Sequence, residues 1–380
     1  MSPRIKTPLN AILPSLRVPI VCGPMSGAAG GKLAAHVSKA GGLGFIGGGY
    51  FSPEQYTKNL EEAAGVLYDE ATEHSGRLDV GVGFLGWGLS KLDGPWDPAT
   101  DALGNHHRRT KAIACIDAAL AARPRAVWLA FGTTEEMAGW ARIMRERERK
   151  INNFEGLEMW KLFVGVGSVE EAKAAVELVG ADVIVAQGCE AGGHGSATAP
   201  PLLNLLSSIV KALPTFIPLD PATRPLVLGA GGLSSGDHLA ALLALGADGA
   251  VYGTRFLFTP ESTYSATRKS LLCAAASGST KRSMAFDEAR NTLDWPAGVD
   301  GRGIVNRTVE EYERGDMDLA QRQERYARAD REDDAERLIV WAGTGVGDVA
   351  EISPARDVVR LLEKEAVNAL GRVSRFLSAE

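Results

Sequence analysis

The chain contains 380 residues, 45% of them hydrophobic and 23% charged, which is typical of a globular protein with a full-sized core. Its formal net charge is −6, with acidic and basic residues interspersed, which argues against a nucleic-acid partner. The apolar runs are far shorter than a membrane span, and prolines interrupt the N-terminal stretch before an apolar signal region can form, so we expect no membrane partner. Since the four cysteines are widely spaced, we expect free thiols and a cytoplasmic location.

Eight short apolar segments predict the buried strands of a parallel sheet. They cover residues 18–22, 43–46, 78–84, 126–131, 162–166, 183–187, 226–230 and 249–252. Amphipathic helices are predicted between most of these strands, at residues 31–40, 53–67, 110–121, 134–149, 169–179 and 235–245. Eight strands that alternate with helices over roughly 240 residues predict an α/β fold of the (β/α)8 TIM barrel type.

The stretch after the third predicted strand does not follow the repeat. Gly81, Gly83 and Gly86 match the G-x-G-x-x-G dinucleotide pattern, but that pattern requires a helix start, and we predict none in the Trp-, Gly- and Pro-containing sequence that follows. We therefore reject a dinucleotide site here. The segment at residues 86–109 is longer than an ordinary βα loop. Its length predicts either a lid or a disordered segment.

The chain continues well beyond the eighth predicted strand. Residues 263–276 and 307–326 have helical patterns, whereas residues 290–307 look like a loop. The expected organisation has three parts: a barrel at residues 1–260, a mainly helical C-terminal subdomain or lid at residues 261–353, and a closing helix packed on the barrel at residues 354–380.

A glycine-rich loop follows the sixth predicted strand and contains His194. Gly193 and Gly195 flank this histidine, so we expect no neighbouring side chain to screen its ring. Imidazole is a base near neutral pH, and barrels of this class bind ligands at the carboxyl ends of their strands. We interpret His194 as a catalytic base. The alternative is a solvated imidazole on a flexible turn.

The last two predicted strands also end in glycine-rich loops, with Gly231 and Gly232 after the seventh strand and Gly253 and Thr254 after the eighth. Glycine lets backbone N–H groups converge on an anion, and a following helix N-terminus adds a favourable field. In (β/α)8 barrels phosphate often binds between these two loops. The loops therefore predict a site for a phosphorylated ligand, although tight turns alone would also need glycine. No His and carboxylate cluster has metal-ligand spacing, so no metal is expected.

Several motifs together match a known family. They are Gly23-Pro-Met-Ser26, Gln187-Gly-Cys-Glu-Ala-Gly-Gly-His194-Gly, Gly229-Ala-Gly-Gly232 and Tyr252-Gly-Thr-Arg-Phe256. With them the chain resembles the nitronate monooxygenases, formerly called 2-nitropropane dioxygenases, and the eukaryotic members most closely. The resemblance covers residues 16–260 well and the tail more loosely, where Trp295-Pro296 and Gly301-Arg302 also look like the family's.

The resemblance implies a barrel at residues 1–260 that binds FMN, and an enzyme that oxidises alkyl nitronates, such as propionate 3-nitronate, or neutral nitroalkanes. O2 is the second substrate, and the products are a carbonyl compound and nitrite. His194 is then the base, and a homodimer is one assembly to consider. The residues that the resemblance assigns to FMN are Pro24, Met25, Ser26, Gln187, Ala191 and Gly192 around the flavin and Gly231, Gly232, Gly253 and Thr254 at its phosphate.

One departure from the family is visible. Many bacterial relatives end the third strand with Gly-Val-Asn, whereas this chain has Gly81-Val82-Gly83, so the Asn contact to the flavin is absent or replaced. Other readings also stand. The chain could be an NAD(P)H-dependent reductase of the same superfamily, acting on an enoyl-ACP or a quinone, or a degenerate barrel that only binds flavin.

Overall fold

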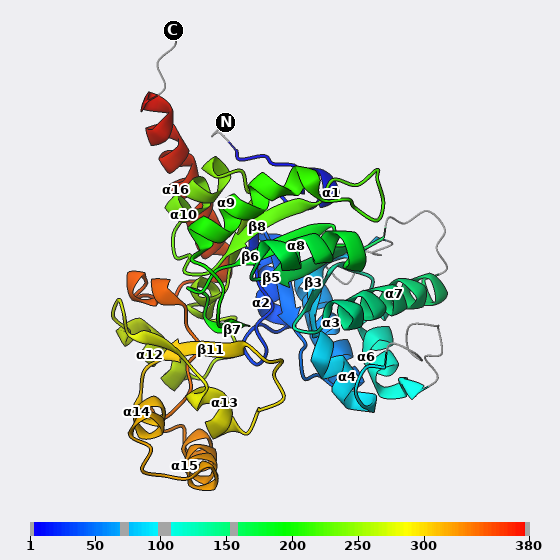
Figure 1. Ribbon diagram of the computed structural model, residues 1–380. Coiled ribbons are helices and arrows are strands. Elements are labelled where there is room, and N and C mark those ends of the chain that lie inside the picture. The colour runs from blue at the N-terminus through cyan, green and yellow to red at the C-terminus, as the bar shows by residue number, and fades with distance from the viewer. Residues whose placement is uncertain (1–3, 69–75, 98–107, 153–158, 377–380) are drawn as a thin grey trace.

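The computed structural model describes residues 4–68, 76–97, 108–152 and 159–376, and its centre is a closed barrel of eight parallel strands (Figure 1). The strands follow one another around the barrel in the order β1-β2-β3-β4-β5-β6-β8-β9. They span Ile20–Cys22, Leu43–Gly47, Leu78–Leu85, Pro124–Ala130, Lys161–Val166, Val183–Gln187, Leu226–Ala230 and Gly249–Tyr252. Each strand falls on the segment predicted for it, so the (β/α)8 barrel is confirmed.

Helices pack around the barrel, and all but the one at residues 202–212 lie where the helical spacing of apolar residues predicts them. They are α2 (Gly31–Lys39), α3 (Pro53–Leu67), α6 (Thr110–Ala121), α7 (Thr134–Ile151), α8 (Val169–Ala174), α9 (Leu202–Ala212) and α10 (Gly236–Ala244). Two of them begin with a capping box, formed by Ser52 with Gln55 on α3 and by Thr133 with Glu136 on α7. Such reciprocal hydrogen bonds satisfy backbone N–H groups that a helix start otherwise leaves unpaired.

Aromatic side chains fill the barrel interior and leave only one end open. The Phe45 ring packs against the rings of Trp128 and Phe163, with centroids 5.3 and 5.1 Å apart. Gly81 makes room for this cluster, because a Cβ there would overlap the Phe45 ring. Helix α1 (Leu9–Ile12) adds Leu9 to the same buried cluster. Ligands must therefore enter from the end where the strands have their carboxyl termini.

The segment after β3 contains a helix that the sequence did not predict. Helix α4 (Gly86–Asp93) begins directly at the end of β3, so the expectation of no helix start after Gly86 is wrong. The helix is held from its first turn, because Trp87 N–H donates to the Phe131 carbonyl and Ser90 Oγ bonds to the Gly86 carbonyl. The contact with Phe131 comes from tertiary packing, whereas the Ser90 bond lies within the helix. Residues 98–107 of the predicted lid lie outside the described residues.

The C-terminal part is not only helical, because it contains a three-stranded antiparallel sheet. Its order is β10-β11-β7, where β10 is Thr280–Ser283, β11 is Val299–Ile304 and β7 is Gly193–Ser196. Two sequence expectations are therefore wrong: residues 290–307 contain a strand, and the glycine-rich loop of His194 is itself a strand. Figure 1 shows β7 and β11 side by side between the barrel and the tail helices.

Four helices accompany this sheet. They are α12 (Ala266–Ala274), α13 (Ala285–Arg290), α14 (Arg307–Arg314) and α15 (Leu319–Glu332). The single helix predicted at residues 307–326 is thus two helices. The break falls at Gly315, whose φ of +68° lies in the left-handed region that favours glycine.

The last long helix, α16 (Ala355–Val373), packs against α10 and α2. Its apolar face, which includes Val358, Val359 and Leu362, is fully buried in the same core cluster as the barrel strands. The approach to α10 is close, because a Cβ on Gly236 would overlap the Leu362 carbonyl oxygen. Within the described ranges, no helix is long and apolar enough to cross a membrane.

The α10–α16 contact predicts different outcomes for two glycine substitutions. Gly236→Ala should lower the free energy of unfolding by about 1–3 kcal/mol, because the added methyl group forces α16 away. Gly371→Ala, at an open position of α16 itself, should leave stability unchanged or raise it by up to about 1 kcal/mol. Urea unfolding of both variants measures the difference. Equal stability of the two would contradict the close packing.

Candidate active site

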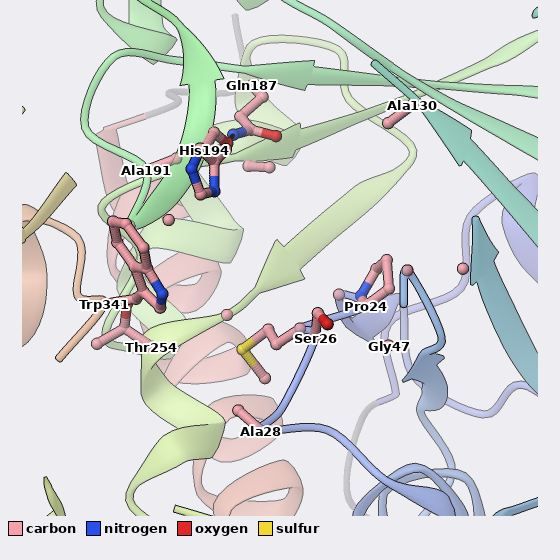
Figure 2. A pocket seen from close by; sticks show the side chains of 18 of the residues that line it. Pro24, Ser26, Ala28, Gly47, Ala130, Gln187, Ala191, His194, Thr254 and Trp341 are labelled. Atoms are coloured by element: carbon pink, nitrogen blue, oxygen red, sulfur yellow. Dashed lines mark hydrogen bonds between the residues drawn. The ribbon is translucent and has the colours of Figure 1, made fainter. Parts of the chain in front are cut away.

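One pocket occupies the open end of the barrel, and it gathers all the residues to which the sequence assigned a role (Figure 2). It lies at the carboxyl ends of the barrel strands and is also lined by side chains from the tail, including Tyr264, Trp295 and Trp341. The sequence-assigned residues that line it are Pro24, Met25, Ser26, Gln187, Ala191, Gly192, His194, Gly231, Gly232, Gly253 and Thr254.

His194 is held on strand β7, with its ring pointing into the pocket (Figure 2). The strand pairs with β11, and His194 lies opposite Gly301. Gln187, at the end of β6, donates from Nε2 to the His194 carbonyl at 2.7 Å. Arg282 donates to the Gly195 carbonyl at 2.8 Å. The backbone on both sides of the imidazole is therefore fixed.

The buried carboxylate of Asp287 holds one nitrogen of this imidazole. Both Asp287 oxygens lie 2.9 Å from His194 Nε2, and the Asp287 side chain is fully buried. Thr292 Oγ1 donates to Asp287 Oδ1 at 2.8 Å, which fixes the carboxylate in turn. A carboxylate accepts a hydrogen bond, so Nε2 carries a proton and Nδ1 is left as the basic nitrogen of the neutral ring. Within the described residues, Nδ1 makes no hydrogen bond.

Two tryptophans cover the His194 ring. Trp295 stacks on it with ring centroids 3.6 Å apart and an angle of 12° between the planes, and Trp341 lies 4.8 Å away at 54°. The His194 side chain is only 10% exposed. The expectation that no side chain screens this ring is therefore wrong. The sequence neighbours Gly193 and Gly195 have no side chains that could contact the ring. Trp295 and Trp341, which lie far away in the sequence, contact it instead.

The loops after β8 and β9 form a cradle of backbone at the other side of the pocket. Gly231 and Gly232 have φ angles of +117° and +70°, which other residues rarely adopt. Gly253 lies directly before the short helix α11 (Thr254–Leu257), and a Cβ there would meet only the Met25 sulfur, at 3.7 Å. The space in front of Gly253 therefore belongs to the pocket.

A tail segment that the sequence did not single out completes this cradle. Gly343 directly precedes the 3-10 turn Thr344–Asp348, and Gly345 lies within it. Both glycines line the same pocket. Gly343 N–H donates to Thr254 Oγ1 at 2.9 Å, which leaves the Thr254 hydroxyl proton available to a ligand.

The phenols that line the pocket are neutral. Burial raises the pKa of Tyr264 to about 12 and raises the pKa of Tyr50 as well. The Tyr264 hydroxyl accepts a hydrogen bond from the backbone N–H of Trp341 at 3.2 Å. Among the described residues that line the pocket, Arg290 has the one permanently charged side chain.

The departure at Gly83 has a steric basis. A Cβ on Gly83 would lie 2.5 Å from the Pro24 Cβ, so an asparagine at this position would require Pro24 to move. In the described parts of the chain, no group of three or more His, Cys, Asp or Glu side chains is placed to hold a metal ion.

The sequence did not identify several pocket neighbours of the barrel, such as Tyr50, Trp128 and Phe131. It also missed five residues of the tail that lie at or beside the site: Asp287, Arg290, Trp341, Gly343 and Gly345. Trp295 was noted as part of a family-like stretch but was given no role. The one signal for Asp287 is a carboxylate among the apolar residues of a short helix, since Ala285, Phe286 and Ala289 are all buried beside it. That pattern indicates a buried carboxylate, but it does not indicate that His194 is its hydrogen-bond partner.

The chain is similar in sequence to proteins of one known family. The sequence profile of the family named nitronate monooxygenase matches residues 6–68 and 157–365. A nitronate monooxygenase of Neurospora crassa is 29% identical over 385 residues, which cover 97% of this chain and 95% of that protein.

Two solved structures also resemble the chain. The nitroalkane oxidase of Streptomyces ansochromogenes has a TM-score of 0.69 at 25% identity, covering 96% of this chain and 99% of that one. FabK of Thermotoga maritima has a TM-score of 0.71 at 23% identity, covering 98% of this chain and 100% of that one, and shares the fold.

The stacking of Trp295 predicts how accessible His194 is to chemical modification. Trp295→Ala should increase the rate at which diethyl pyrocarbonate modifies His194 several-fold, because it removes the indole that covers the ring. Peptide mass spectrometry measures the rate, with the half-buried His36 as an internal reference. Trp87→Ala is the matched control, because it removes an indole that contacts Trp295 and, among the described ring contacts, does not touch His194. Unchanged modification of His194 in Trp295→Ala would show that the indole does not shield it.

Proposed function

This chain belongs to the nitronate monooxygenase family, and from that premise we propose that it is an FMN-dependent enzyme that oxidises alkyl nitronates with O2. The products are a carbonyl compound and nitrite. The observation that carries the proposal is the His194–Asp287 pair, which presents a basic imidazole nitrogen in the same pocket as a glycine-lined anion cradle. The name of the Streptomyces nitroalkane oxidase, whose fold matches, supports the same class of substrate.

The pocket fits FMN in two respects. The open backbone at Gly231, Gly232 and Gly253, together with the Thr254 hydroxyl, offers hydrogen-bond donors to a phosphate where side chains would block it. The segment Pro24–Ser26 and the Gln187 side chain lie at the strand ends where the ring system would rest. When bound, FMN would accept electrons from the nitronate and allow their transfer to O2.

His194 would then act on the α-proton of a neutral nitroalkane. With Nε2 engaged by Asp287, Nδ1 takes the proton, and the buried carboxylate stabilises the imidazolium that forms. The protonated ring also attracts the anionic nitronate, whether that anion is formed in the pocket or enters already ionised. Trp295 and Trp341 exclude water from the ring, which strengthens both interactions.

A direct experiment tests the assignment. The purified protein should be yellow, or become so with added FMN, and should consume O2 when ethyl nitronate or propionate 3-nitronate is supplied. Rapid flavin reduction by NADH or NADPH without nitronate-dependent O2 uptake would instead identify a reductase of the same superfamily. A protein that stays colourless after incubation with FMN would refute the cofactor assignment.

The role of His194 as a base predicts a split between two kinds of substrate. His194→Asn should lower kcat/KM for neutral nitroalkanes by about 100- to 10,000-fold, the usual contribution of a general base. Much of the activity on preformed nitronates should remain, because they need no deprotonation. Oxygen-electrode assays with nitroethane and ethyl nitronate measure both rates. Equal losses on the two substrates would mean that His194 serves binding and not proton transfer.

The proposed phosphate cradle predicts a specific loss of cofactor affinity. Gly253→Ala should weaken FMN binding by about tenfold or more, or ~1.4 kcal/mol, because the added methyl group occupies the space of the phosphate. The fold should persist, since that methyl group would meet only the Met25 sulfur. Fluorescence titration of the apoprotein measures the dissociation constant. Gly65→Ala, at an open position of α3, is the matched control. Wild-type affinity in Gly253→Ala would place the phosphate elsewhere.

A further inference from the structure

The active-site pocket adjoins a second cavity in the tail. Both cavities are lined by Ser26, Tyr264, Arg290 and Trp341. Helix α15 forms a wall of the second cavity with side chains that include Gln323 and Tyr326. A small nitroalkane would occupy only the space beside His194. The second cavity therefore offers room for the remainder of a longer substrate.

Arg290 lies at the junction of these two cavities. It is the last residue of α13, one turn after Asp287, so one short helix supplies both the carboxylate that holds His194 and this guanidinium. Its Cζ lies 5.8 Å from the centre of the Trp341 ring, the same indole that approaches His194 to 4.8 Å. The guanidinium and the base therefore flank a single aromatic ring.

No carboxylate in the described part of the chain forms an ion pair with Arg290. Its side chain is exposed, and it makes neither an ion pair nor a hydrogen bond with any residue in the ranges that the structure describes. Arg268 in the second cavity differs, because it donates to Asp330 at 2.5 Å and to the Ile339 carbonyl.

The carboxylates around Arg290 have other partners or lie away from the first cavity. Asp287 binds His194 and Thr292, and Asp294 pairs with Lys91. Glu324 is exposed and lines only the second cavity. No carboxylate is among the described residues that line the active-site pocket. An anionic group entering this pocket would meet a guanidinium without a competing protein anion.

We propose that Arg290 binds a second anionic group on the substrate, a carboxylate at the end of a short tail that extends from the nitronate toward the second cavity. This inference rests on the proposed function and names the residue that recognises the carboxylate of a substrate such as propionate 3-nitronate. Arg290 is thus a specificity residue: it recognises the tail and takes no part in the proton transfer. A guanidinium matches a carboxylate in shape as well as in charge, because it can donate two parallel hydrogen bonds.

The experiment compares two nitronates of similar size, propyl 1-nitronate and propionate 3-nitronate, on the FMN-loaded enzyme. Arg290→Gln should lower kcat/KM for the carboxylate substrate by about 10- to 100-fold and leave the uncharged-tail substrate within about threefold. Arg290→Lys should recover part of the loss. Arg331→Gln removes the same charge from an exposed position of α15 that lines neither cavity, and should affect neither substrate.

Ionic strength and cofactor affinity provide two further readouts. In the wild type, kcat/KM for propionate 3-nitronate should fall as salt is added, and Arg290→Gln should lose this dependence because the screened charge is gone. The FMN dissociation constant should not change in Arg290→Gln. Weaker FMN binding in this variant would place Arg290 at the cofactor and overturn the proposal.

The remaining outcomes separate the inference from the function on which it rests. If the wild type oxidises both nitronates and Arg290→Gln changes them equally, or changes neither, the carboxylate subsite is refuted and the enzyme assignment stands. If the wild type oxidises neither nitronate, the proposed function fails and the subsite fails with it.

Discussion

The hydrogen bond between His194 Nε2 and the buried Asp287 carboxylate joins the barrel to its tail at the reactive end of the pocket. It decides which nitrogen of the imidazole is basic, and it requires that β7, β11 and α13 keep their relative positions. An unpaired carboxylate would be costly to bury, so the histidine and the aspartate depend on each other. The geometry of the site is therefore inseparable from the folding of the tail.

The barrel contributes a rigid frame with one open end. Aromatic packing of Phe45, Trp128 and Phe163 blocks its interior, and the glycines that follow β8 and β9 leave backbone groups exposed at the opposite end. The tail then closes over this mouth. Trp295 covers the imidazole, while the segment at Gly343 hydrogen-bonds to Thr254 and extends the backbone cradle. The result is a pocket with glycine backbone groups on the barrel side and two tryptophan rings on the tail side.

Few of the described side chains that line the pocket can carry a charge, so those that do indicate the charge of the ligand. Burial keeps the phenols of Tyr50 and Tyr264 neutral, and the Asp287 carboxylate is committed to its hydrogen bonds. The charges that a ligand meets are those of the imidazole, when it is protonated, and of Arg290. Both are positive, which supports the proposed anionic nitronate substrate and, at Arg290, the proposed second anionic group. The imidazole is only 10% exposed, so a charge on it is screened less than a charge on the surface.

The sequence by itself determined the barrel, because strand and helix periodicity is a local property, and each of the eight strands lies where its apolar run predicts it. It also brought His194 and the glycines after the last two strands to one end, since parallel strands direct their carboxyl ends the same way. The tertiary structure alone decided that the His194 loop is a strand, that residues 290–307 contain its partner, and that Asp287 and two tryptophans surround the ring. Asp287 lies 93 residues from His194 in the chain, and no local pattern encodes a contact across that distance. Helix α4 shows the same limit, because packing against Phe131 and neighbouring helices gave a helix to a sequence with weak helical signals.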